Sequence, residues 1–122
     1  MEDIEVILRA NHLSKRFGGL RAVDDVSFEV TRLGVTSIIG PNGAGKSTLF
    51  NLISGTFMAD SGLVELDGLN VTQMSPEERL SCGMARSFQI TNLFFDLSVI
   101  DNLRIASQAL ESRSHLFLPL SK

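Results

Sequence analysis

The stretch that decides the fold is GPNGAGKS, from Gly40 to Ser47. It fits the pattern G-x-x-x-x-G-K-[ST], a P-loop, which requires a strand before it and a helix after it. The β-branched run from Val35 to Ile39 predicts that strand. The segment from Lys46 to Ser54 has apolar residues at helical spacing, and Gly55 stands where a C-terminal cap belongs. Strand, glycine loop and helix in this order predict an α/β fold.

The chemistry of the loop points to a bound polyphosphate. Gly43 and Gly45 lack a Cβ, so the backbone can direct several N–H groups at one anion. The helix that begins near Lys46 adds free N–H donors and the positive end of its dipole. Lys46 supplies a cation for the β- and γ-phosphates, and Ser47 offers a hydroxyl to Mg²⁺. We predict that the nucleotide contacts Asn42, Gly43, Ala44, Gly45, Lys46, Ser47 and, next to the α-phosphate, Thr48.

Other elements follow from periodicity and turn signals. The segments Ile4–Leu8 and Val26–Val30 alternate apolar and polar residues, and the glycine pair at 18–19 permits a turn between them. An antiparallel start to the fold is therefore expected. Further strands are predicted over Leu63–Gly68, with a turn, and over Met84–Phe88.

Two further helices are predicted from capping residues. Ser75, with Pro76 and Glu78 behind it, forms a capping box that opens a short helix ending by Gly83. Ser98 is expected to cap a second helix. The apolar face of that helix would consist of Leu103, Ile105, Ala106 and Leu110.

Composition excludes several classes of protein. The 122 residues are 43% hydrophobic and 20% charged, which predicts one globular domain and disfavours disorder, collagen-like repeats and coiled coils. The net charge of -3 disfavours a nucleic-acid partner. We find no apolar run long enough to span a membrane, and the acidic N-terminus is unlike a secretory signal. Cys82 is the only cysteine, so it forms no internal disulfide, and we expect it to be buried.

Before the loop, the segment LSKRFGGLRAVDDVSF from Leu13 to Phe28 resembles the opening of the ATP-binding cassette (ABC) family. The resemblance to this family covers essentially the whole chain. It implies an ABC-type P-loop NTPase cassette with an N-terminal antiparallel β portion, which binds ATP and Mg²⁺. By position, the resemblance implies that Phe17 stacks on adenine and that Val23 lies against the same base. The alternative is that Phe17 is a core aromatic residue beside a turn.

A second motif, RSFQ from Arg86 to Gln89, resembles the Q-loop of this family. The resemblance implies that Gln89 ligates Mg²⁺ and senses the attacking water, which gives it a catalytic role together with Lys46. Its loop would couple the nucleotide to a transmembrane partner. Within the family, GPNGAGKST with RSFQ and LSVIDNL most resembles the ATPase subunit of bacterial branched-chain amino acid importers.

The sequence also departs from the family pattern. Thr31 to Gly34 replaces the usual Pro-Gly-Glu before the loop, and no Leu-Ser-Gly-Gly-Gln signature, Walker B Asp-Glu pair or switch His occurs before Lys122. Without that carboxylate no residue is an evident base or orienter for water. We therefore expect residues 1–122 to be the N-terminal part of one ABC ATP-binding domain, which is incomplete and does not hydrolyse ATP alone.

The resemblance implies partners as well. A second ATPase subunit, identical or related, would complete each ATP site, and closure on ATP would drive a membrane permease. The permease contact is expected in the loop from Ile90 to Asp96, although its apolar residues Leu93, Phe94 and Phe95 could instead be core. A periplasmic or extracellular binding protein would take part indirectly. The expected location is the cytoplasmic face of the cell membrane, through the permease.

Two other classes of function stay open at this point. An ABC protein that works without a permease, or a nucleotide-binding module without hydrolysis, would carry the same motifs. Two tandem cassettes would favour that class. A P-loop GTPase or small-molecule kinase is less favoured, because Asp-x-x-Gly and Asn-Lys-x-Asp are both absent from the sequence.

Overall fold

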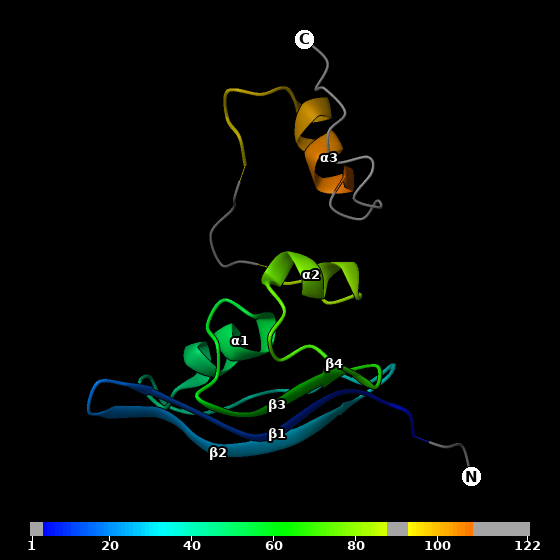
Figure 1. The fold of residues 1–122 in the computed structure, drawn as a ribbon. Helices are drawn as coiled ribbons and strands as arrows, with labels where there is room; N and C mark the ends of the chain where they lie inside the picture. Colours follow the sequence, from blue (N-terminus) through cyan, green and yellow to red (C-terminus); the bar gives the residue numbers. More distant parts are fainter. Residues whose placement is uncertain (1–3, 88–92, 109–122) are drawn as a thin grey trace.

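The computed structural model describes residues 4–87 and 93–108. Among them, four strands form one antiparallel sheet in the order β2-β1-β3-β4, with helix α1 across one face (Figure 1). The strands are β1 (Val6–Phe17), β2 (Leu20–Thr31), β3 (Ser61–Leu66) and β4 (Leu69–Asn70).

The first two strands form the expected hairpin. Phe17 pairs with Leu20 across the turn at residues 18–19, where Gly18 has a φ of 59°. Each strand has 12 residues, which is longer than the alternating pattern indicates. The reason is that β1 is hydrogen-bonded on one edge to β2 and on the other to β3, so pairing continues through its polar stretches.

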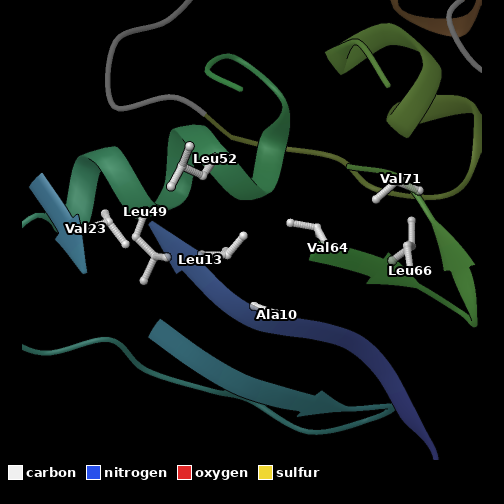
Figure 2. Close-up of a cluster of buried hydrophobic side chains, with 8 residues drawn as sticks. All are labelled: Ala10, Leu13, Val23, Leu49, Leu52, Val64, Leu66 and Val71. Atoms are coloured by element: carbon white, nitrogen blue, oxygen red, sulfur yellow. The ribbon is translucent and has the colours of Figure 1, made fainter. Parts of the chain in front are cut away.

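Helix α1 spans Lys46–Ser54, as predicted from the sequence. Gly45 before it and Gly55 after it both have left-handed backbones, with φ of 93° and 86°. Leu49 points from α1 toward the sheet (Figure 2), and Leu52 of the same helix is also buried. The buried cluster comprises Ala10, Leu13, Val23, Leu49, Leu52, Val64, Leu66 and Val71.

The other helices are α2 (Pro76–Ser81) and α3 (Val99–Gln108). Both begin at the predicted caps: Ser75 Oγ accepts from Glu78 N at 3.2 Å, and Ser98 Oγ accepts from Asp101 N at 3.2 Å. On the predicted apolar face of α3, Leu103 and Ala106 are exposed and Ile105 is half-buried, and Leu110 lies outside the described residues. In Figure 1, α3 lies away from the sheet. Within the described ranges, no helix combines the length and apolarity needed to cross a bilayer.

Three sequence expectations are wrong. Residues 35–39 form no strand, and Val35 and Ile39 are 97% and 93% exposed, because no described strand pairs with them. Residues 84–87 likewise form no strand, and the rest of that expected element is outside the described residues. Cys82, the C-cap of α2, is exposed.

Candidate functional site

The predicted P-loop leads directly into α1. Gly43 and Gly45 have φ of 86° and 93°, a region that side chains with a Cβ rarely adopt. Within the loop, Ala44 N donates to Pro41 O at 3.1 Å, and this hydrogen bond closes a turn. The backbone therefore has the geometry that the glycine pattern requires.

The two glycines have different surroundings. A Cβ on Gly45 would lie 2.2 Å from Ala22 O, so the loop packs on β2 only because residue 45 is glycine. A Cβ on Gly43 would meet nothing within 4 Å. Gly45 thus fixes the loop to the sheet, while Gly43 leaves the outer side of the loop open.

The N-terminus of α1 has the donors that a polyphosphate needs. Gly45 is the N-cap and offers no side-chain hydrogen bond to the first turn of the helix. Lys46 reaches back across the loop, where its Nζ donates to Gly40 O. Thr48 is half-buried, and the remaining side chains, those of Asn42, Ala44 and Ser47, are exposed. An ammonium group and uncapped N–H groups fit an anionic ligand.

A cavity of about 380 Å³ opens beside the loop. It brings Val23 together with Ala44, Gly45 and Lys46, although these residues come from β2 and from the loop. Arg21 and Asp24, which form an ion pair of 3.0 Å, also line the cavity. Ile38 and Ile39 contribute apolar side chains to the lining. Val23 and the loop, two predicted parts of one site, therefore share a cavity.

Phe17 lies at the end of β1 and outside the lining of that cavity. Its ring contacts that of Phe57 edge to face, with centroids 5.4 Å apart and an interplanar angle of 72°. Phe17 is 44% exposed, so it is not part of the buried core. The ring keeps area on which a planar group could stack.

Arg86 connects the RSFQ motif to α1. Its guanidinium donates to Asn51 Oδ1 at 2.6 Å and to Ser54 Oγ at 3.2 Å. The start of the motif therefore lies against the helix that follows the P-loop. Gln89 and residues 90–92 are outside the described part of the chain, so the predicted Mg²⁺ ligand and the first half of the predicted permease loop have no structural account here.

Sequence reasoning missed Arg79, which is 1% exposed. Its guanidinium donates to the carbonyls of Leu52 and Ile53, at 2.8 and 2.6 Å, in the last turn of α1. It also donates to the carbonyls of Thr72 and Met74, at 2.9 and 3.0 Å. Burial lowers the pKa of Arg79, yet arginine stays protonated. An arginine on a short polar helix is usually exposed, so no sequence pattern indicates this role.

The described part of the predicted permease loop, residues 93–96, is exposed and contains three apolar residues. Leu93, Phe94 and Phe95 all lie at the surface. Asn102 on α3 holds the turn behind them: its Oδ1 accepts from Phe94 N at 3.0 Å, and its Nδ2 donates to the Phe94 and Ser98 carbonyls at 3.1 and 2.9 Å. The expected alternative of core packing does not describe these three side chains in this structure.

Comparison with known proteins places this geometry in a family. The family model described as ABC transporter matches residues 23–120. A probable branched-chain amino acid transport ATP-binding protein of Methanocaldococcus jannaschii is 42% identical over 105 residues, covering 86% of this chain and 41% of the relative. A high-affinity branched-chain amino acid transport ATP-binding protein of Pseudomonas aeruginosa is 40% identical over 100 residues, covering 82% and 39%.

The fold agrees with a solved structure. A crystal structure of a nucleotide-free ATP-binding cassette from an ABC transporter superposes with a TM-score of 0.76 at 40% identity, covering 92% of this chain and 45% of that one. The chain belongs to the ABC transporter family, and the predicted cassette fold with its antiparallel β portion is confirmed. It spans less than half the length of these relatives.

Proposed function

We propose that this chain is the nucleotide-binding part of the ATP-binding, energy-coupling subunit of an ABC importer, with branched-chain amino acids as the imported solutes. The observation that carries the ATP-binding proposal is the pair of left-handed glycines at the head of α1, beside Lys46 and without a side-chain cap. The names of the relatives from Methanocaldococcus jannaschii and Pseudomonas aeruginosa support the transport class and the solute.

Each residue of the loop has a role in this proposal. Backbone N–H groups from Asn42 to Thr48 hold the phosphates, and Lys46 exchanges its bond to Gly40 O for a phosphate oxygen. Ser47 and Gln89 provide oxygens for Mg²⁺, whose other ligands would be phosphate and water. Phe17 and Val23 contact the base. ATP, when bound, supplies the free energy of phosphoryl transfer, and these residues bind and orient it.

The wider assembly is part of the same proposal. Residues 1–122 act as the N-terminal part of one ATP-binding domain, and hydrolysis requires a signature motif, a Walker B Asp-Glu pair and a switch His that this sequence lacks. A second ATPase subunit completes each site, and a permease contacts the loop from Ile90 to Asp96. The exposed Phe94 and Phe95 support that contact. A binding protein outside the cell delivers the solute, and the ATPase works at the cytoplasmic face of the membrane.

The test is a calorimetric titration of the chain with Mg-ATP. Lys46→Gln should weaken binding by at least about tenfold, because it removes the cation nearest the phosphates. Arg9→Gln is the matched control: it also removes one positive charge, but Arg9 pairs with Glu29 at 2.8 Å on the sheet, away from the loop. Equal affinities for the wild type and Lys46→Gln would refute the proposal.

A further inference from the structure

The segment that follows α1 returns to the end of the β1–β2 hairpin. Phe57 N donates to Asn51 O at 3.1 Å, which keeps the segment against the helix. The Phe57 ring makes the edge-to-face contact with Phe17. Edge-to-face contacts between aromatic rings are favourable beyond the area that they bury, so this contact favours one orientation of the Phe17 ring over others.

Asp60 fastens the same segment to β1. Its two carboxylate oxygens accept from Arg16 N at 2.7 Å and from Lys15 Nζ at 3.2 Å. Its own N–H donates to Ser14 O at 2.9 Å. The backbone bond from Arg16 and the bond from Lys15 lower the pKa of Asp60, so the carboxylate is charged at neutral pH.

Lys15 completes the arrangement. Its Nζ lies 5.4 Å from the centroid of the Phe17 ring, within cation–π range, while it is bound to Asp60. Asp60 thus holds Arg16, the residue before Phe17, through the bond from Arg16 N. It also holds Lys15, whose ammonium group lies over the Phe17 ring. Phe57 is half-buried and packs against the core, but Phe17 stays 44% exposed and the Asp60 side chain is also exposed, so core packing alone does not account for the contacts of these two residues.

We propose that Phe57 and Asp60 are positioning residues, which hold the Phe17 ring ready for the base of a bound nucleotide. The inference rests on the proposed function, in which Phe17 stacks on that base. Without these contacts, the Phe17 ring beside the two-residue turn of the hairpin would lose rotamer freedom when the base binds. That loss of entropy would weaken nucleotide binding. Because Phe57 is also bonded to α1, the ring is tied to the helix whose other end would bind the phosphates.

The experiment compares ATP with inorganic tripolyphosphate, which has the phosphates but no base. Both ligands are titrated with Mg²⁺ into the 122-residue chain and its variants. Phe57→Leu and Asp60→Asn should each weaken ATP binding about three- to tenfold and leave tripolyphosphate binding unchanged. Phe17→Ala should do the same. A merely structural role would lower both affinities together.

The matched control is Asp67→Asn. Asp67 is also an exposed aspartate that binds a cation, Arg32 at 3.0 Å, but it lies at the turn between β3 and β4, where its N–H donates to Ile7 O near the start of β1. This variant should leave the ratio of the two affinities unchanged. Asp60→Asn keeps shape and volume, so it remains informative should Phe57→Leu unfold the chain.

The outcomes separate the two proposals. If Asp60→Asn and Phe57→Leu bind ATP as tightly as the wild type does, and the ratio of the ATP affinity to the tripolyphosphate affinity is unchanged, the positioning role is overturned. The P-loop proposal is then left intact. An unchanged ratio in Phe17→Ala overturns the stacking platform itself. If Lys46→Gln changes neither the affinity for ATP nor the affinity for tripolyphosphate, the proposed function is overturned instead.

Discussion

Gly45 and Gly43 share a left-handed backbone but differ in what surrounds them. We predict that Gly43→Ala costs about 1 kcal/mol, the strain of a Cβ in that conformation. Gly45→Ala should cost more than about 2 kcal/mol, because its Cβ would also meet Ala22 O at 2.2 Å. Urea unfolding of both variants measures the difference. Equal losses would show that the contact with β2 does not constrain the loop.

Arg79 is the second residue with a sharp expectation. Arg79→Met removes the guanidinium that donates to four backbone carbonyls, of which Leu52 O keeps the bond from Gly55 N, so the free energy of unfolding should fall by about 2–4 kcal/mol. Arg79→Lys should lie between the wild type and Arg79→Met, because one ammonium reaches fewer of these carbonyls. Urea denaturation gives all three values. A methionine variant within about 0.5 kcal/mol of the wild type would contradict this role.

Individual residues were predictable where a local rule decides their state. The positive φ of Gly43 and Gly45 follows from the loop pattern, and Ser75 and Ser98 cap helices for reasons contained in the next three residues. Burial was not predictable in the same way. Cys82 is exposed although cysteines are usually buried, since its place depends on how α2 packs.

At the scale of elements, α1 and the segment 35–39 form an informative contrast. Both have apolar patterns, but α1 satisfies its own backbone hydrogen bonds and has a glycine at each end. Its own sequence is therefore enough to predict the helix. A strand needs partners, and residues 35–39 have none among the described strands. The sequence could indicate an extended apolar segment there, but pairing depends on other parts of the fold.

The turn that carries Phe94 and Phe95 is the element for which the sequence left two interpretations. If it is an interface, Phe95→Ser should change the free energy of unfolding by less than about 0.5 kcal/mol, since the side chain is 86% exposed. Leu49→Ala in α1, a buried reference, should cost about 2–5 kcal/mol. Urea denaturation compares them. A loss above about 2 kcal/mol for Phe95→Ser would favour core packing.

At the scale of the molecule, the sequence predicts the order of elements better than their arrangement. The hairpin, α1, the strand that includes Leu63 to Leu66 and α2 occur where expected. The position of β1 between β2 and β3 had no local signal, because it depends on pairing between distant segments. The same holds for the contacts of Phe57 and Asp60 with the hairpin end, which join residues 40 or more positions apart.

The candidate site follows the same division. The P-loop residues are contiguous, so one motif predicts them together, whereas Val23 enters the cavity from β2 and was assigned only by resemblance to the family. Arg79 supports the site from the far end of α1 through backbone carbonyls, which leave no trace in a sequence pattern. Contacts with the backbone are therefore the part of this site that sequence reasoning reaches least.

The most direct test of the account is to follow the backbone amide resonances of the ¹⁵N-labelled chain while Mg-ATP is added. We predict that the largest shifts occur at the amides from Asn42 to Thr48, with smaller shifts at Phe17 and Val23. Shifts confined to other regions, such as α3, or no shifts at millimolar ATP, would contradict the claim that the loop before α1 is a nucleotide site.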